Sequence, residues 1–249
     1  MNDTGELLAA RVHVETYRAF AALGLPPAAE LDVDRALREV PLHSQRVLFE
    51  AAADAGLSEA QAVPRLASLW SLAAAINVMD DISDGDCVYL PARAAPGTQM
   101  LLHALAMWLA AAGGVSASAL QAQTEGIMRM AAGQNVEVRT QTWSAQTYVE
   151  ITAQVAGAQY AAHLALLWSG TPLESRALEL GRALGMVGMI AKDTISIDQR
   201  LTSLSAAERR NLGQWAGEQL RVLKSHDLRC VLMLCRYADS ALQALSAEH

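Results

Sequence analysis

Three carboxylates lie within five residues in the segment Asp-Asp-Ile-Ser-Asp at positions 80–84. Residues 66–79 before it are mainly apolar and predict a helix, on which side chains four residues apart share a face. Asp80 and Asp84 would then repel each other unless a cation compensates their charges. Mg²⁺ commonly takes one or two carboxylates and completes its coordination with water and phosphate oxygens. We therefore expect Asp80 and Asp84 to be Mg²⁺ ligands, and Asp81 either to support them or to contact a further metal ion.

A simpler interpretation of the same segment is a solvated acidic end of a helix. Acidic residues at a helix C-terminus oppose the helix dipole, however, so this arrangement costs free energy without a cation. A calcium loop of the EF-hand type is excluded, because the acids follow a helical run and lack the twelve-residue spacing that ends in Glu.

The rest of the sequence predicts an all-α protein. Alanine and leucine dominate the apolar residues, aromatic residues make up only 5%, and no alternating strand pattern is present. We expect one helical domain over residues 1–249, a bundle whose site forms between facing helices. The expected helices cover residues 5–23, 28–56, 58–85, 98–112, 118–141, 144–169, 172–201, 205–224 and 226–246.

The composition of the chain argues against several classes of binding partner. The net charge is −7 and no basic stripe is present, which argues against a nucleic-acid surface. No apolar run is long enough for a transmembrane segment, and the first residues lack the pattern of a signal peptide. The three cysteines have no metal-binding spacing, so we expect reduced thiols and a cytoplasmic location.

Four segments in order resemble the trans-isoprenyl diphosphate synthase (polyprenyl synthetase) family, within the class I isoprenoid synthase superfamily. The resemblance covers roughly residues 40–200 and rests on four segments: the acidic segment at 80–84, Gly-Gln-Asn-Val-Glu at 133–137, the helix led by Tyr148, and residues 184–196. It implies an all-α isoprenoid synthase fold around an apolar cavity, Mg²⁺ as cofactor, and binding and ionisation of an allylic prenyl diphosphate. It also implies a homodimer. Gln134 would hydrogen-bond near the carbocation or act as an ordinary core amide.

The second aspartate-rich motif of that family is degenerate here. Only Asp193 remains, with Lys192 before it and Ser196 at the last acidic position. On one uninterrupted helix, Lys192, Ser196 and Arg200 would share a face. One hypothesis is that Lys192 and Arg200 replace the charge of one metal and contact diphosphate directly, beside Asp193 and Ser196. The alternative is a decayed site or an ordinary solvated face.

Residues that bind the second substrate in the family are mostly missing. Arg46 is all that remains of its basic segment, and Tyr89-Leu90 stands where an arginine pair is expected. Condensation with isopentenyl diphosphate is therefore in doubt. The alternatives are a terpene-synthase-like cyclase or lyase that uses one prenyl diphosphate, and a catalytically silent partner subunit of a prenyl synthase.

Ala75 and Ile76 lie at the positions that limit product length in the family. Small side chains there would leave a deep tunnel for a substrate of 15 carbons or more. Equally, these residues could simply allow close helix packing.

Overall fold

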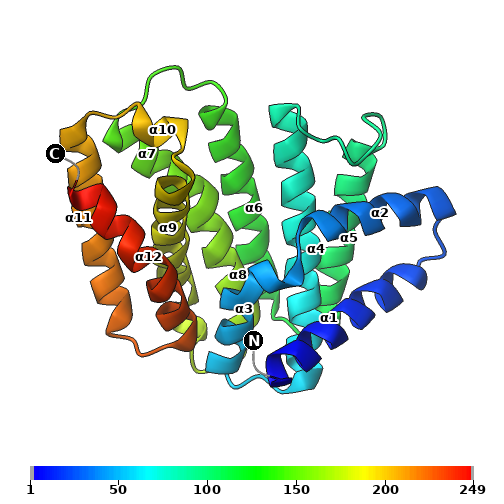
Figure 1. Cartoon of the computed structure of the whole chain (residues 1–249). Coiled ribbons are helices and arrows are strands. Elements are labelled where there is room, and N and C mark those ends of the chain that lie inside the picture. Colours follow the sequence, from blue (N-terminus) through cyan, green and yellow to red (C-terminus); the bar gives the residue numbers. More distant parts are fainter. Residues whose placement is uncertain (1–2, 248–249) are drawn as a thin grey trace. The chain divides into compact units, whose positions relative to one another are not determined.

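The computed structural model describes residues 3–247, and within that range every regular element is helical (Figure 1). The all-α prediction is confirmed. The α-helices are α1 (Asp3–Ala21), α2 (Pro27–Glu39), α3 (Arg46–Asp54), α4 (Glu59–Asp84), α5 (Ala95–Ala112), α6 (Ala117–Glu137), α7 (Ala145–Thr152), α8 (Ala158–Trp168), α9 (Ala177–Ser196), α10 (Gln199–Thr202), α11 (Ala206–Lys224) and α12 (Arg229–Ala247). Three short elements complete the chain: η1 (Leu42–Gln45), the π-helix η2 (Ala153–Gly157) and η3 (Glu174–Arg176).

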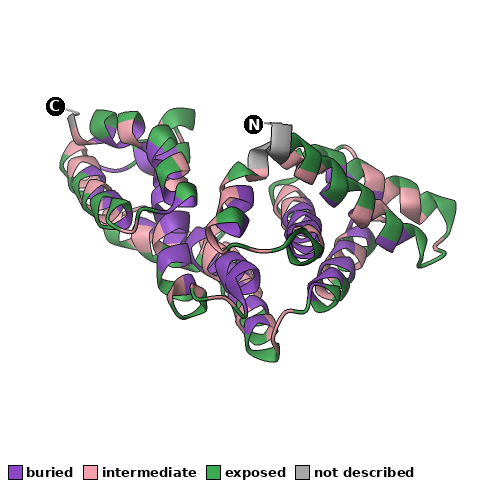
Figure 2. Cartoon of the chain, turned by 90° about the horizontal axis from the view of Figure 1, so that it is seen from below, coloured by how far each residue is buried: buried purple, intermediate pink, exposed green. Residues whose placement is uncertain are grey.

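The helices gather into two compact units. The first unit comprises Met1–Ala52 with Gly56–Ser116, and the second comprises Ala53–Ala55 with Ala117–His249. Buried residues lie on the inward sides of the helices and exposed residues on their outward sides (Figure 2). The interpretation of residues 1–249 as one domain stays a prediction.

In the first unit, α4 packs along α5, and α1 and α2 contact this pair. The start of α4 is a capping box, in which Ser58 and Gln61 satisfy each other's backbone groups. Pro64 lies in the first turns of α4, and the helix continues through it to Asp84. The left-handed Gly85, with a φ of 80°, ends the helix directly after the acidic segment.

Helix α4 is long and apolar enough to cross a membrane by length and composition alone. Of its most apolar 18-residue window, 78% is buried inside the protein. That degree of burial is typical of the central helix of a packed bundle.

In the second unit, α8 packs between α6 and α9, and α9 also contacts α11 and α12. Glycines permit the closest of these contacts. A Cβ atom at Gly185 of α9 would lie only 2.1 Å from the backbone oxygen of Ala156, and one at Gly181 would lie 2.5 Å from that of Tyr160. The start of α12 is capped by Asp54, whose carboxylate accepts hydrogen bonds from the backbone N–H groups of Arg229 and Cys230. Cys230 and Cys235 are buried, and neither is part of a disulfide among the described residues.

Two of the predicted helices are interrupted in the structure, so their prediction as continuous helices was wrong. The helix expected over residues 28–56 ends at Glu39, because Pro41 disfavours a helical conformation in the residue before it. The helix expected over residues 172–201 ends at Ser196. Ile197 there has a φ of 55°, and Asp198 begins a separate short helix by accepting a hydrogen bond from the backbone of Arg200.

Candidate functional site

The acidic segment of the first unit forms the last turns of α4. Asp80 and Asp81 are half-buried, whereas Asp84 is exposed at the end of the helix. The helical setting predicted for these residues is confirmed, and it places Asp80 and Asp84 one turn apart on the same side. After Gly85 the chain folds back, and the backbone N–H groups of Asp86 and Cys87 both donate to the backbone oxygen of Asp81.

Asp81 is held in a defined orientation by two neighbours. The hydroxyl of Tyr89 donates to its Oδ2 over 2.6 Å, and the side-chain amide of Asn77 donates to the same oxygen over 2.8 Å. Asn77 also donates to the Tyr89 hydroxyl, so the three side chains form a closed set. Burial and the hydrogen bond to Asp81 raise the pKa of Tyr89, which keeps its hydroxyl protonated as a donor.

This donor set suits a cation that shares its coordination with a ligand. Within residues 3–247, no three His, Cys, Asp or Glu side chains are grouped as a ready metal site. Two aspartates one turn apart nevertheless fit Mg²⁺, which retains several waters or phosphate oxygens and needs few protein ligands. Asp80 and Asp84 are the residues that would hold it, with Asp81 fixed beside them.

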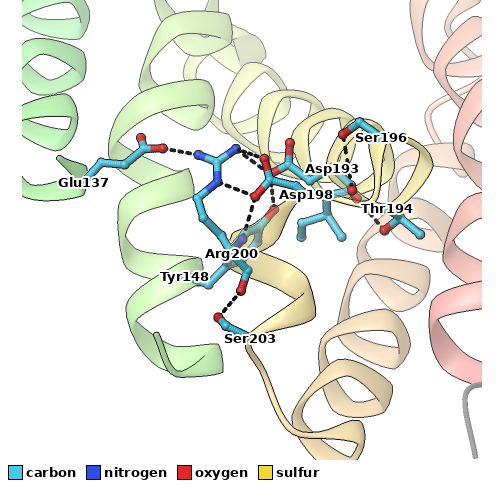
Figure 3. A network of polar contacts seen from close by, with 9 residues as sticks. Glu137, Tyr148, Asp193, Thr194, Ser196, Asp198, Arg200 and Ser203 are labelled. Atoms are coloured by element: carbon cyan, nitrogen blue, oxygen red, sulfur yellow. Dashed lines mark hydrogen bonds and ion pairs between the residues drawn. The ribbon is translucent and has the colours of Figure 1, made fainter. Parts of the chain in front are cut away.

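The second unit contains an arginine enclosed by carboxylates (Figure 3). Arg200 donates from Nε to Oδ1 of Asp198 over 2.8 Å and from Nη2 to Oδ2 of Asp198 over 2.9 Å. The same Nη2 donates to Oδ2 of Asp193 over 3.1 Å, and Nη1 forms an ion pair with Glu137. One guanidinium therefore joins carboxylates from α6, α9 and the turn before α10.

Asp193 is the most deeply placed of these carboxylates, with 1% of its side chain exposed. Tyr148 donates its hydroxyl to the same Oδ2 over 2.6 Å. Burial raises the pKa of Asp193 despite the opposing effects of Tyr148 and Arg200. For Arg200, burial lowers the pKa, but the hydrogen bond to Asp198 and the nearby carboxylates outweigh it and raise the pKa above its usual value.

The predicted stripe of Lys192, Ser196 and Arg200 on one helix face is wrong. Because α9 ends at Ser196, Arg200 belongs to α10 and turns back to the carboxylates. Lys192 and Ser196 are exposed on α9, and the Ser196 hydroxyl makes only a long 3.4 Å contact with the backbone oxygen of Asp193. Lys192 and Arg200 therefore do not share one helix face.

The other residues predicted for the site are Gln134, Arg46, Ala75 and Ile76. Gln134 is half-buried on α6, one turn before Glu137. Arg46 is exposed at the first residue of α3. Ala75 is 1% exposed within α4, and Ile76 next to it is half-buried.

Several residues of these clusters were missed as site residues. Glu137 and Tyr148 belonged to segments that carried the family resemblance, so a signal for them existed. Asn77 stands four residues before Asp81, a spacing that brings helical side chains together. Tyr89 and Asp198 gave no local signal, because their partners depend on how the chain turns after Gly85 and Ile197.

Comparison with known proteins identifies the fold. No family model and no curated protein matches the sequence. The geranyltranstransferase of Thermotoga maritima has a similar structure, with a TM-score of 0.70 and 15% identity over 97% of this chain and 99% of that one. A deletion mutant of the heterotetrameric geranyl pyrophosphate synthase of mint gives a TM-score of 0.65 and 13% identity over 98% of this chain and 100% of that one.

A third similar structure is the polyprenyl synthase of Caulobacter crescentus, solved in complex with calcium and isoprenyl diphosphate. Its TM-score is 0.57, with 14% identity over 95% of this chain and 86% of that one. The chain thus has the all-α fold of the trans-prenyl diphosphate synthases, as the sequence resemblance predicted.

Proposed function

We propose that this chain is a polyprenyl-synthetase-like transferase that binds and ionises an allylic prenyl diphosphate with Mg²⁺. The observation that carries the proposal is the end of α4. There Asp80 and Asp84 lie one turn apart and Asp81 is fixed by Tyr89, in a chain with the fold of prenyl synthases. Membership of the polyprenyl synthetase family is part of the same proposal.

The chain's own residues would act mainly by holding and orienting the diphosphate. Bound Mg²⁺ would neutralise negative charge as diphosphate departs. Asp80 and Asp84 would hold the cation, while Tyr89 and Asn77 keep Asp81 in one orientation beside them. Gln134 stays a predicted catalytic residue that hydrogen-bonds near the carbocation, and Arg46 and Lys192 stay predicted substrate contacts. Ala75 and Ile76 stay predicted determinants of a chain of 15 carbons or more.

Pyrophosphate release tests this function. Purified protein is incubated with geranyl, farnesyl or geranylgeranyl diphosphate and Mg²⁺, with and without isopentenyl diphosphate. Release that requires isopentenyl diphosphate supports the transferase, and release without it supports the cyclase or lyase. In either case D80N/D84N should lose release, whereas E39Q, which changes an exposed acid of α2, should not. Release that survives in D80N/D84N would contradict the proposed site.

One observation favours a second candidate, a catalytically silent partner subunit. Asp193, the only acid retained from the second motif, is already engaged by Tyr148 and Arg200. The structurally similar synthase of mint is heterotetrameric. This candidate predicts Mg²⁺-dependent binding of prenyl diphosphate with no pyrophosphate release by the chain alone.

A homodimer is the predicted assembly, and α5 supports it. The helix carries no Asp, Glu, Lys or Arg from Ala95 to Ala112. Met100 and Trp108, eight residues apart and thus on the same side, are 70% and 45% exposed. An uncharged helix side with large exposed apolar residues is typical of a surface that a partner covers. A cytoplasmic location stays a prediction from the reduced thiols.

A further inference from the structure

We propose that Arg200 takes the place of a divalent cation among the carboxylates of the second unit, and that its presence prevents a cation from binding there. The proposal goes beyond the diphosphate site on α4, because it concerns a different unit and makes a statement about metal stoichiometry. Mg²⁺ held at the proposed diphosphate site would then be bound by Asp80 and Asp84 and not by these carboxylates.

The contacts of Arg200 resemble the role of a metal in one respect: a single cationic group gathers carboxylates from separate elements. Glu137 comes from the last residue of α6, Asp193 from α9, and Asp198 from the turn before α10. A guanidinium offers five donors in a planar fork, which suits several carboxylate oxygens at once. In Figure 3 the three carboxylates lie around the guanidinium.

The buried negative charge of the three carboxylates explains why a cation must occupy the position of Arg200. The side chains of Glu137, Asp193 and Asp198 are only 17%, 1% and 25% exposed, so water screens them poorly. Removing the paired cation from buried carboxylates is strongly unfavourable unless a proton or another cation replaces it. Lys192 on α9 also attracts Asp193 and Asp198, but it does so more weakly than Arg200 and from an exposed side chain, so it leaves most of their charge uncompensated.

The geometry also explains why a metal is excluded while Arg200 is present. Oδ2 of Asp193 already accepts from both Tyr148 and Arg200, and both oxygens of Asp198 accept from Arg200. A metal would have to displace these charge-assisted hydrogen bonds, which are stronger than neutral ones. With Arg200 in place, the three acids are not grouped as a ready metal site within residues 3–247. Without the guanidinium they would be hard oxygen ligands of the kind that Mg²⁺ and Mn²⁺ take, once a cation draws them together.

Mn²⁺ binding measured without any prenyl diphosphate tests the proposal. The parent is D80N/D84N, which removes the proposed first site, and binding is followed by electron paramagnetic resonance at pH 8. We expect no bound Mn²⁺ in the parent and about one per chain after R200Q is added. R200K, which retains a positive charge, should bind none, and D193N should abolish the binding gained by R200Q.

Two results would overturn the proposal: a folded R200Q variant that binds no Mn²⁺, or a parent that already binds Mn²⁺ in a D193N-sensitive manner. Circular dichroism verifies helical folding of each variant. If R200Q fails to fold, the parent and its D193N derivative decide the matter alone, since D193N-sensitive binding contradicts the proposal and its absence supports it. Because no substrate is used and the first site is removed, the outcome is independent of the proposed transferase activity.

Discussion

Tyr148 donates its hydroxyl to Oδ2 of Asp193 over 2.6 Å, and it does so at a carboxylate that is almost fully buried. Tyr89 makes a bond of the same length to Oδ2 of Asp81. By the sequence resemblance, the two aspartates correspond to the second position of the two acidic motifs, and they lie in different units. In each unit, therefore, a protonated phenol fixes the aspartate that the sequence resemblance selects. The two differ in their surroundings, because only Asp193 also faces an arginine.

Replacing Tyr89 by Phe should weaken Mg²⁺-dependent binding of prenyl diphosphate. The hydroxyl holds Asp81, and loss of a group that orients a site residue typically lowers metal affinity about 10–100-fold. Isothermal titration with farnesyl diphosphate and Mg²⁺ measures the effect. Y17F is a matched control, since Tyr17 also donates to an aspartate, Asp34, over 2.6 Å but at the first helices. Equal loss in both variants would show that Tyr89 acts only through stability.

Adding one methyl group at Gly185 should destabilise the second unit by about 2–3 kcal/mol, because overpacking against backbone cannot relax easily. The new Cβ would lie 2.1 Å from the oxygen of Ala156 in η2, so η2 or α9 must shift. Gly217 of α11 has open space around it, and G217A should instead stabilise by about 0.5–1 kcal/mol through lower backbone entropy. Urea unfolding compares the two, and a neutral G185A would show that the helices separate readily.

Stability should fall between pH 6.5 and 4 because of His163. Burial lowers the pKa of this histidine to about 4, and its ring nitrogens have no hydrogen-bond partner among the described residues. Below about pH 6.5 the imidazole of His163 binds a proton in the unfolded chain but not in the folded chain. The free energy of unfolding therefore decreases by about 1.4 kcal/mol for each unit by which the pH falls. The loss is complete near the folded pKa, at about 3 kcal/mol in total.

Urea unfolding of wild type and H163L between pH 7 and 5 isolates this contribution. H163L should remove this part of the slope, because leucine does not titrate. Q123L is the control, since Gln123 is equally buried and without a hydrogen-bond partner among the described residues, but has no titrating group. A slope retained in H163L would assign the pH dependence to other groups.

A charge on the exposed side of α5 should break the predicted homodimer. W108E places a carboxylate on a helix that otherwise has no Asp, Glu, Lys or Arg, and burying an unpaired charge in an interface is costly. Sedimentation velocity should show monomers for W108E at concentrations where wild type is dimeric. V222E, at an exposed apolar residue of α11, is the matched control. A wild-type chain that sediments as a monomer would contradict the predicted assembly.

The sequence predicted the helical class and most helix positions because local signals decide them. Ser58 and Ser205 both begin helices through capping boxes, as their spacing to Gln61 and Glu208 indicates. The break at Ile197 had no such signal. A β-branched residue rarely adopts positive φ, so local preference argued for a continued helix. The contacts of Arg200 with Asp193 and Asp198 accompany this break, and they become visible only in three dimensions.

The candidate site was predictable only in part for the same reason. Asp80, Asp81 and Asp84 are neighbours in sequence, so their grouping on α4 followed from helix geometry. The partner of Asp81 on the far side of the turn, Tyr89, depends on the path of the chain after Gly85. The role inferred for Arg200 failed because it rested on the phase of a helix that ends before it.

The π-helix Ala153–Gly157 has a consequence for insertions and deletions in this chain. A π-helix corresponds to one residue more than an α-helical turn requires. Deleting one residue there would regularise the backbone between α7 and α8. It would also rotate everything that follows by about 100°, the angle between successive residues of an α-helix. The apolar side of α8 would then turn away from α6 and α9. The extra residue of the π-helix therefore determines which side of α8 packs against these two helices.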